Sequence, residues 1–543
     1  MDESGTAMDG GVTRSVWLGV DLPDYERDLR RDVRCHVCVI GAGMTGLSVA
    51  YELARTGRRV VVIDDGPIAG GESARTSAHL ASVLDTRYHE LERLLGVDRA
   101  RLAADSHRAA IDRIEAIAAE EGIACELQRI EGYLFASGGG YRRGELGELE
   151  QERDACRRAG FTGVDVLGQV PLAGLALGPA LRVPRQGQLQ PLRYLAGLVR
   201  AIERRGGRVI SCTRATEVHD GAPALVVTAS GATIRADAVV VATHTPFNDR
   251  VAVHTKLAGY RSYVIGLAVR RGALPPMLLW DTEDPYHYVR LARPDLVIVG
   301  GEDHKVGQED EPSYRFERLE RWARRCFPIL GARSVAWSGQ VMESVDGLGY
   351  IGVNPRQRNV YVATGYGGNG LTHAAIAGML IADLIRDRPN PWAALYSPRR
   401  RTLRATPQWL RENLNAAAQY RDWLTPGEQD AVASVGLGEA AIIRKGTRKL
   451  AVYRDRMGAV YVCSAACPHL GGAVRWNQCE HTWDCPVHGS RFDVDGRVIH
   501  GPAGADLTTI SHPDEATIEI DEERPVLDPT ALAQPGLSRE GGR

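Results

Sequence analysis

Four residues near the C-terminus place the strongest constraint on how this chain can fold. Cys467-Pro468-His469 is followed, after fifteen residues, by Cys485-Pro486-Val487-His488, so each half of the pattern offers one thiolate and one imidazole. A Rieske 2Fe-2S cluster needs that set, because two cysteines hold one iron and two histidines hold the other. Pro and Gly residues accompany both halves, which favours two tight loops. We therefore predict a Rieske 2Fe-2S cluster with four ligands: Cys467, His469, Cys485 and His488.

Two other interpretations of these four residues stay open at this point. A mononuclear zinc site also uses two cysteines and two histidines, although zinc fingers usually place both cysteines in one half and both histidines in the other. The residues could also be buried thiols beside surface histidines, without a metal. The cluster interpretation makes the chain a carrier of single electrons.

The length and charge of the chain limit which other roles it can have. At 543 residues it exceeds what one hydrophobic core supports, so two or three domains are expected. The formal net charge is −2, and Lys and Arg are mixed with Asp and Glu, which argues against nucleic acid as a partner. The sequence has no apolar run long enough to span a membrane, and its acidic start lacks a signal-peptide core. We expect a cytoplasmic protein without a membrane span, and assembly into a homo-oligomer stays open.

A glycine-rich loop near the N-terminus predicts a dinucleotide site. An apolar run at 35–40 is typical of a buried strand, and a helical pattern follows the loop at 41–46. Such a loop brings main-chain amides and a helix N-terminus to a pyrophosphate. The next strand, 59–63, ends in an acid at the offset where a carboxylate accepts ribose hydroxyls. An ordinary glycine turn with a solvated acid is the alternative. The predicted binding residues are Gly41, Gly43, Met44, Thr45, Gly46 and Asp64.

A second glycine-rich loop favours FAD over NAD. The strand expected at 359–364 leads into a loop at 365–372, and a helix is expected to follow to about residue 385. Reduction leaves negative charge on one edge of a flavin ring, which amides at a helix N-terminus stabilise, whereas an NAD site rarely needs a second loop of this kind. We predict that FAD contacts Gly365, Gly367, Gly368, Asn369, Gly370, Leu371 and Thr372.

These segments resemble the D-amino-acid-oxidase-like family of FAD-dependent oxidoreductases, which is related to glycine and sarcosine oxidases. The matching stretches are 39–48, 337–340, 346–352 and 364–372. The order of the whole chain is similar to a bacterial group of FAD-dependent oxidoreductases with a C-terminal Rieske domain. The resemblance implies an α/β fold in which a Rossmann-like FAD-binding domain is interleaved with an antiparallel substrate-binding sheet, followed by a small all-β Rieske domain.

The predicted organisation has five parts. They are an N-terminal extension at 1–34, an FAD-dependent oxidoreductase domain at 35–393, a linker helix at 394–424, a Rieske domain at 425–525 and a disordered tail at 526–543. Segments rich in Tyr, Val and Arg are expected to form the substrate-binding sheet, at 132–137, 261–269, 286–291 and 296–301.

Two arginines are candidates for binding the substrate. The carboxylate of an amino acid or N-alkyl glycine favours an arginine that donates two parallel hydrogen bonds. Arg290, which shares a predicted strand with Tyr288, is the first candidate, and Arg261 is the second. Each could instead be a structural ion-pair partner.

Other candidates lie close to the expected flavin ring. Tyr366, in the second glycine loop, is expected to flank the ring, and Arg75, Thr76 and Ser77 are expected near the ring or the phosphates. His79 lies where some members of the family attach FAD covalently, but noncovalent FAD is our expectation.

The combination of two redox centres predicts a reaction. An amine or amino acid would lose a hydride from the carbon beside its nitrogen to flavin N5, and the electrons would leave one at a time through the Rieske cluster. An external one-electron acceptor, such as a ferredoxin, a cytochrome or a quinone, would receive them. The alternatives are a flavin/Rieske reductase that serves a partner enzyme, and C–O oxidation or natural-product tailoring.

Overall fold

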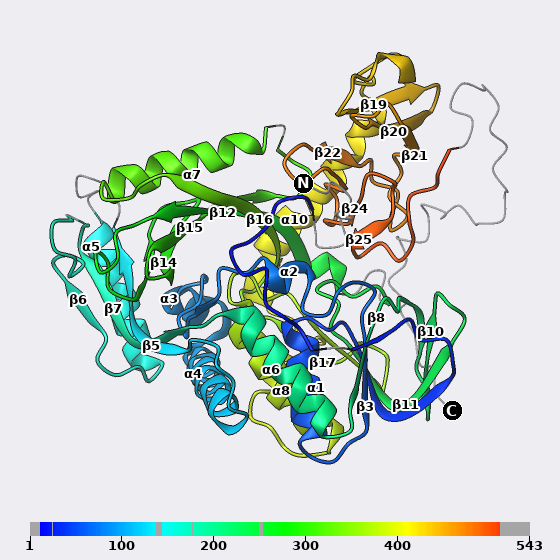
Figure 1. Ribbon diagram of the computed structural model, residues 1–543. Coiled ribbons are helices and arrows are strands. Elements are labelled where there is room, and N and C mark those ends of the chain that lie inside the picture. The colour runs from blue at the N-terminus through cyan, green and yellow to red at the C-terminus, as the bar shows by residue number, and fades with distance from the viewer. Residues whose placement is uncertain are drawn as a thin grey trace, which may run out of the picture.

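The computed structural model describes residues 11–23, 25–136, 144–175, 177–248, 253–309 and 311–510. The tail predicted at 526–543 lies outside the described residues, as do 511–525 of the predicted Rieske domain and 1–10 of the predicted N-terminal extension. Figure 1 shows a large body of sheets and helices with a smaller β module beside it, at the upper right, and α10 (Thr406–Ala418) between them.

The first sheet builds the nucleotide-binding half of the large body. Its parallel core runs in the order β8 (Arg208–Ser211), β3 (Val60–Ile63), β2 (Val33–Ile40), β11 (Thr233–Val241) and β18 (Val360–Thr364). The sheet is extended by β1 (Glu26–Arg27), β10 (Ala224–Thr228), β9 (Ala215–His219) and β17 (Tyr350–Val353). All four residues of β3 are buried, as expected for a central parallel strand that is covered on both faces.

Three helices pack on this sheet and others pack on them. The helices α1 (Met44–Ala54), α6 (Pro191–Arg204) and α8 (Gly370–Ile385) contact its strands. The helix α4 (Val97–Glu120) packs on α8, α3 (Tyr88–Leu95) packs on α4, and the short α2 (Gly71–Ala74) contacts α6. The helices α1 and α8 pack against each other, and a Cβ added at Gly378 would lie 3.0 Å from the carbonyl oxygen of Ser48. This close crossing brings the N-termini of both helices to the same side of the sheet.

The second sheet contains all four segments that were expected to form it. Its order is β16 (Arg333–Ser344), β12 (Leu257–Ala268), β15 (Leu296–Lys305), β14 (His287–Arg293), β13 (Met277–Asp281), β5 (Gln128–Phe135), β7 (Ala180–Gln188) and β4 (His79–Leu80), with β6 (Asp165–Leu167) paired to β7. The β5–β13 pair is parallel, so the sheet is mixed rather than purely antiparallel. The chain passes through the first sheet between these two strands, so no hairpin fixes their relative direction.

The two faces of the second sheet have different neighbours. Tyr263 and Ile265 belong to an apolar cluster with α7 (Ser313–Cys326), whereas Ser262 and Val264 line a cavity on the opposite face. This alternation follows from the period of two along a strand. The helix α5 (Glu145–Arg158) packs against β7 of this sheet.

The segment predicted as a linker helix is helical over most of its length. The elements η3 (Leu403–Ala405), α10 and η4 (Gln419–Leu424) follow one another without a gap, and α9 (Ala393–Tyr396) stands apart before them. Pro407 stands in the first turn of α10, a position that accepts proline, whereas Pro398 precedes η3 and cannot continue a helix. No helix in the described ranges is both long and apolar enough to cross a membrane.

The small module consists of two antiparallel sheets preceded by η5 (Val432–Ser434). One sheet contains β19 (Glu439–Lys445), β20 (Arg448–Arg454) and β21 (Val460–Ser464). The other contains β22 (Arg475–Asn477), β23 (Thr482–Asp484), β24 (Arg491–Phe492) and β25 (Val498–His500). The loops before β22 and after β23 carry the four predicted cluster ligands.

Candidate active site and cluster site

A cavity of about 490 Å³ lies between the two sheets of the large body. Most of the predicted FAD-binding residues line it: Gly41, Gly43, Met44, Thr45, Asp64, Arg75, Thr76, Ser77, Gly365, Gly367, Gly368, Asn369, Gly370 and Leu371. Two predicted residues lie behind this wall. A Cβ added at Gly46 would lie 1.7 Å from the carbonyl oxygen of Gly41, so Gly46 permits close packing, and the hydroxyl of Thr372 contacts His107 Nδ1 at 2.8 Å.

The first glycine loop has the geometry that a pyrophosphate requires. Gly41 has φ +104°, and a Cβ there would lie 2.5 Å from the carbonyl oxygen of Ala242. The Asp64 carboxylate orders the loop, because it accepts hydrogen bonds from the amides of Ala42 (2.5 Å) and Gly66 (2.9 Å). Its position on the cavity wall also suits a ribose hydroxyl.

Neither helix N-terminus at the cavity is capped by its own N-cap residue. Gly43, the N-cap of α1, has no side chain, and the side chain of Asn369, the N-cap of α8, accepts no hydrogen bond from the first turn. The Met44 amide donates to Ser73 Oγ at 2.9 Å, and the other first-turn amides and the helix dipoles favour negative charge there. The donor set therefore fits FAD, whose phosphates would lie at α1 and the electron-rich edge of whose ring would lie at α8.

The structure places Arg290 away from the cavity, contrary to the prediction that it binds a substrate carboxylate. Its guanidinium donates to the carbonyl oxygens of Ala78 and of Leu189 (3.3 Å), and lies 5.2 Å from the centre of the Trp17 ring. Burial lowers the pKa of Arg290 to about 9. These contacts use the guanidinium to join segments around the end of β4.

Arg261 is also placed elsewhere. Its guanidinium is fully buried and donates to Ser338 Oγ and, at 3.0 Å, to Glu480 Oε1. Glu480 belongs to the hairpin between β22 and β23 of the small module, so the arginine joins two parts of the protein. Neither Arg261 nor Arg290 is among the residues that line the cavity.

The aromatic candidates do line the cavity. The hydroxyl of Tyr288 lies 3.3 Å from Ser262 Oγ, and the ring of Tyr366 stacks on His373 with centroids 5.0 Å apart. The edge of the His79 ring meets Tyr288, and His79 Nε2 has no hydrogen-bond partner among the described residues. Burial and the charge of Arg290 lower the pKa of His79 to about 3, so this imidazole is neutral.

The four predicted metal ligands converge at the end of the small module. The thiols of Cys467 and Cys485 are within hydrogen-bond reach of each other, and the rings of His469 and His488 have centroids 5.0 Å apart. Burial and the two neighbouring histidines, His469 and His254, lower the pKa of His488 to about 3. A neutral imidazole is the form that binds a metal, so the set fits a Rieske cluster.

A neutral hydrogen bond connects the second cluster loop to a residue that lines the cavity. Gln340 of β16 lines the cavity, and its Nε2 donates to the carbonyl oxygen of Gly489 at 2.8 Å. Gly489 directly follows the predicted ligand His488. A second contact is made by His254, whose ring meets that of His469 with centroids 5.0 Å apart. We call the Gln340–Gly489 contact the cluster junction.

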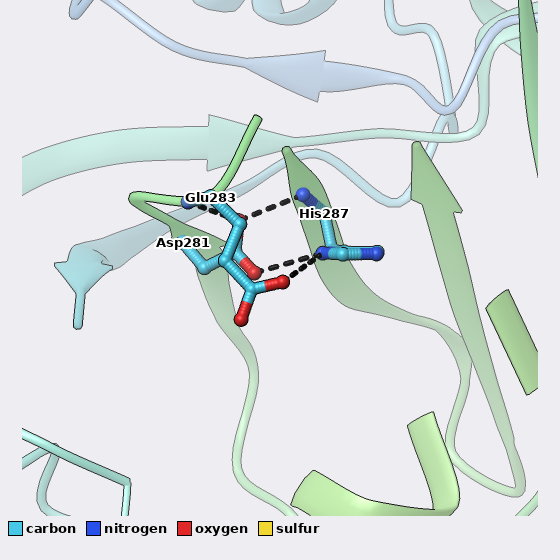
Figure 2. Close-up of side chains that lie close together, drawn as sticks. All are labelled: Asp281, Glu283 and His287. Atoms are coloured by element: carbon cyan, nitrogen blue, oxygen red, sulfur yellow. Dashed lines mark hydrogen bonds and ion pairs between the residues drawn. The ribbon is translucent and has the colours of Figure 1, made fainter. Parts of the chain in front are cut away.

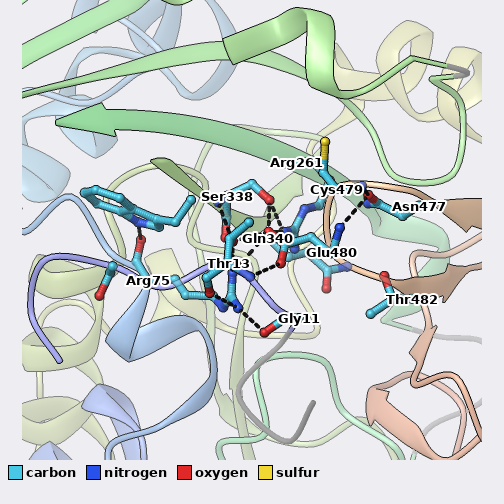
Figure 3. Close-up of polar contacts among 12 residues, drawn as sticks. Gly11, Thr13, Arg75, Arg261, Ser338, Gln340, Asn477, Cys479, Glu480 and Thr482 are labelled. Carbon is cyan, nitrogen blue, oxygen red and sulfur yellow. Dashed lines mark hydrogen bonds and ion pairs between the residues drawn. The ribbon is translucent and has the colours of Figure 1, made fainter. Parts of the chain in front are cut away.

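A buried ionic group makes a separate connection between the two bodies. Figure 3 shows Glu480 between Arg75 and Arg261, with Ser338 and Thr13 beside them. Glu480 Oε1 lies 3.2 Å from Arg75 and 3.0 Å from Arg261. Although burial opposes it, the cations of Arg75, Arg261 and Arg491 lower the pKa of Glu480. We call this group the Glu480 clamp, and it uses the guanidinium of Arg75 that was predicted to approach the flavin or its phosphates.

The small module also forms part of the cavity wall. Val498, Ile499 and His500 of β25 line the cavity, as do Gly501, Ala503 and Gly504 after it. His500 Nε2 lies 3.0 Å from Glu72 Oε1, and Arg214 pairs with Asp506 at 2.9 Å. These contacts lie toward the Asp64 end of the cavity, where Thr213 donates its amide to the Asp64 carbonyl.

Comparisons with known proteins agree with this division. Residues 36–384 match the family model of FAD-dependent oxidoreductases, and residues 426–511 match the Rieske [2Fe-2S] domain. The chain belongs to the FAD-dependent oxidoreductase family. It carries a Rieske domain, and its cofactors are FAD and a 2Fe-2S cluster.

Relatives and solved structures resemble the oxidoreductase over different lengths. The Bacillus subtilis (strain 168) protein YhfW, named for a Rieske 2Fe-2S iron-sulfur centre, is 31% identical over 89% of this chain and 94% of its own. The gamma-glutamylputrescine oxidoreductase of Escherichia coli (strain K12) is 28% identical over 66% of this chain and 85% of its own. The crystal structure of glycine oxidase from Geobacillus kaustophilus has a TM-score of 0.58 and 20% identity, and covers 68% of this chain and 99% of its own. The fold is thus glycine oxidase-like, with a C-terminal β region that matches a Rieske domain.

A cluster of two acids and one histidine at the cavity of this oxidoreductase has the residue types of a metal site, but its side chains are paired with one another. Figure 2 shows Asp281 and Glu283 beside His287. His287 Nδ1 lies 2.8 Å from Asp281, and Nε2 lies 3.4 Å from Glu302. Although burial opposes it, these hydrogen bonds raise the pKa of His287 to about 9. Both ring nitrogens of His287 are thus paired with carboxylates, and its amide also donates to Asp281 at 2.8 Å, so the group links β13 to β14 across their turn.

The sequence analysis did not predict a role for two residues that connect these sites. Gln340 lies inside a recognised segment, but only its contact with Gly489 gives it a role. Glu480 lies in the hairpin between the two cluster loops, and only its contacts with Arg75 and Arg261 give it a role.

Proposed function

We propose that this FAD-dependent oxidoreductase of the amine and amino-acid oxidase type is a dehydrogenase that passes electrons singly from its flavin site to its own Rieske cluster. The cluster junction carries this proposal, because one hydrogen bond connects the wall of the FAD cavity to the residue after a cluster ligand. The relatives support the reaction class, since their names include an oxidoreductase of gamma-glutamylputrescine and an oxidase of glycine.

The proposed reaction oxidises a C–N bond. The carbon beside the nitrogen loses a hydride and the nitrogen loses a proton, which gives an imine that water hydrolyses to a carbonyl compound and an amine. Bound FAD supplies the hydride acceptor, and a bound Rieske cluster supplies a one-electron carrier.

The chain's own residues contribute position and charge stabilisation. Ser262 and Tyr288 form the sheet wall that would hold a substrate opposite the two glycine loops. Amides in the first turn of α8, from Gly370 onward, stabilise negative charge on the cofactor side. We also propose that FAD is bound noncovalently, that the final acceptor is an external one-electron carrier and that the protein works in the cytoplasm.

Anaerobic mixing tests this function. The holoprotein would be mixed with secondary amines, N-methyl amino acids, hydroxy acids and NAD(P)H in separate runs, and the absorbance of flavin and cluster would be followed in time. We expect an amine or amino acid to bleach the flavin first and to reduce the cluster afterwards. Bleaching by NAD(P)H alone would overturn the proposal in favour of a reductase, and bleaching only by hydroxy acids would indicate C–O oxidation.

A further inference from the structure

The linker between the two bodies carries exposed apolar side chains. On α10, Leu410 and Leu414 stand one turn apart, and η4 adds Tyr420 and Leu424; all four are between 37% and 82% exposed. A single exposed leucine is ordinary on a protein surface, whereas several on one element mark a binding surface. We call these four residues the linker stripe.

The linker stripe ends at the first cluster loop. The hydroxyl of Tyr420 donates to the carbonyl oxygen of Leu470 at 2.7 Å, and Trp423 Nε1 donates to that of Gly471 at 2.9 Å. Leu470 and Gly471 directly follow the predicted ligand His469, and both Tyr420 and Gly471 are exposed. A molecule bound over the stripe would therefore lie against a loop that holds the cluster.

The two cluster loops have different neighbours. The second loop bonds Gln340, which lines the FAD cavity, through the carbonyl oxygen of Gly489. The first loop meets the large body through His469, whose ring contacts that of His254, but the residues after His469 bond the linker. An electron that arrives from the cavity through the second loop can thus leave through the first loop on the linker side.

The linker surface is positively charged. Four of its arginines are exposed: Arg401, Arg404, Arg411 and Arg421. The two acids in the 399–424 segment are buried and already paired. Glu412 pairs with Lys305, and Asp422 pairs with Arg475 at 2.8 Å. The exposed charge of the segment therefore comes from its arginines.

The β19–β20 hairpin continues this positive surface. Arg444 of the hairpin donates to the carbonyl oxygen of Thr425 at 2.8 Å, so the hairpin lies beside the end of the linker. Its cations are Arg444, Lys445 and Arg448, and the exposed acids that follow the linker are Glu428 and Asp430. The surroundings of the linker stripe thus hold a surplus of cations, which complements an acidic partner.

Two other occupants fit this surface less well. A second copy related by a two-fold axis would bring Arg411 and Arg421 of both chains into one interface, where like charges repel. An anionic membrane would be attracted by the arginines, but it has no use for a contact with the cluster loop. An acidic redox protein uses all three features: the apolar stripe, the positive charge and the loop.

We infer that the linker stripe is the docking surface for an acidic one-electron carrier protein, which receives its electron from the cluster through the first loop. In this step the reduced cluster loses one electron and the oxidised carrier gains it, and no covalent bond is made or broken. The inference rests on the proposed external acceptor, and it gives that acceptor a chemical class and a place on the chain.

Reduction of two carriers of opposite charge tests the surface without any substrate. The holoprotein would be reduced with dithionite, desalted under argon and mixed with an acidic or a basic c-type cytochrome of similar size and reduction potential. Haem absorbance gives the rate. We expect the acidic cytochrome to be reduced about tenfold faster or more at low ionic strength, with a rate that falls as salt is added. Equal or faster reduction of the basic cytochrome would overturn the inference.

Two double variants separate the charge of the surface from its apolar contact. Arg411→Gln/Arg421→Gln should slow reduction of the acidic cytochrome about fivefold or more at low salt and much less at high salt, because it removes steering. Leu414→Ser/Leu424→Ser should slow it at every salt concentration, because it removes apolar contact area. Both leucines are largely exposed, so the fold should tolerate the change.

A matched variant controls for net charge. Arg34→Gln/Arg200→Gln removes the same charge from exposed positions on β2 and α6, in the nucleotide-binding half, and should change the rate less than about twofold. The cluster absorption of each variant shows whether the module is intact. Unchanged rates in both stripe variants, with the cluster retained, would contradict the docking surface.

The other occupants give their own results. Sedimentation velocity would reveal a dimer, and flotation with phosphatidylglycerol vesicles would reveal membrane binding. A dimer that Leu414→Ser/Leu424→Ser dissolves would assign the stripe to a second copy, and vesicle binding that Arg411→Gln/Arg421→Gln abolishes would assign it to a membrane. Either result would overturn the inference.

This test and that of the proposed function can fail separately. Dithionite supplies the electrons here, so a preference for the acidic cytochrome would stand even if no amine or amino acid reduced the flavin. Conversely, an amine that reduces the flavin and then the cluster, in a protein that shows no preference between the cytochromes, would leave the proposed function standing and the inference wrong.

Discussion

Two of the regions in which the Rieske module meets the catalytic body differ in chemistry. The Glu480 clamp is buried and ionic, with one carboxylate shared by Arg75 and Arg261, whereas the cluster junction is a single neutral hydrogen bond from Gln340 to Gly489. Charges beside an iron-sulfur cluster alter its potential, so a neutral contact disturbs the cluster least. The difference suggests that docking and electron transfer are assigned to separate residues.

Removing the cluster should leave the FAD site intact. Cys467→Ser is expected to abolish the iron-sulfur spectrum completely, because a hydroxyl is a poor substitute for a thiolate ligand. FAD should remain bound, since the residue lies outside the cavity wall. Absorption spectra and iron content measure both outcomes. Cys463→Ser, at a buried thiol in the same module that is not a predicted ligand, is the control and should keep its iron.

Breaking the clamp should loosen the two bodies. Glu480→Gln leaves the buried guanidinium groups of Arg75 and Arg261 without their shared counter-charge, which typically costs about 3–5 kcal/mol. The free energy of unfolding and the rate of protease cleavage in the 394–424 segment would report it. Asp506→Asn removes an exposed pair at the same interface, with Arg214, and should cost about 1 kcal/mol or less. Equal costs for the two variants would contradict the assignment of docking to the clamp.

The clamp should also weaken in acid. The pKa of Glu480 is lower in the folded chain than its ordinary value of 4.5. A carboxyl of this kind stabilises the fold above its unfolded pKa, and the stability is lost as the pH falls through the folded pKa. We therefore expect the stability difference between the native chain and Glu480→Gln to be constant above about pH 5 and to shrink below it. Unfolding measured across this range tests the prediction, and a difference that grew in acid would contradict it.

Changing the junction should affect electron transfer more than stability. Gln340→Leu removes one hydrogen bond, at a cost of about 1 kcal/mol, but it should slow cluster reduction after flavin reduction severalfold. Stopped-flow absorbance resolves the two steps. Gln308→Leu is the matched control, because Gln308 donates to Pro486 in the same cluster loop at 3.1 Å without lining the cavity. Equal slowing in both variants would show that loop position, rather than the Gln340 route, sets the rate.

Local spacing made part of the site predictable. The ligands Cys467 and His469 are two residues apart, and the loop around Gly41 lies between a buried strand and a helix, so chemistry and position could be read within a short window. The same holds for the strands of the second sheet, whose apolar alternation is a local property. These features predicted the two cofactors, FAD and a 2Fe-2S cluster.

Long-range partners made the rest unpredictable. Arg261 and Glu480 are 219 residues apart, and Arg290 bonds a carbonyl 212 residues before it, so neither arginine could be assigned a partner from its neighbours in sequence. From sequence alone, each is an arginine on a strand and could bind a substrate carboxylate. Only the folded structure shows that each guanidinium bonds to a distant part of the chain instead.

The wall formed by Val498 to Gly504 has a consequence for how the protein matures. A ribosome makes these residues long after both glycine loops have emerged. FAD can therefore meet its complete site only after β25 has been made, and a fragment that stops before β25 would present a cavity with one side open. Acquisition of the flavin is thus tied to completion of the iron-sulfur module.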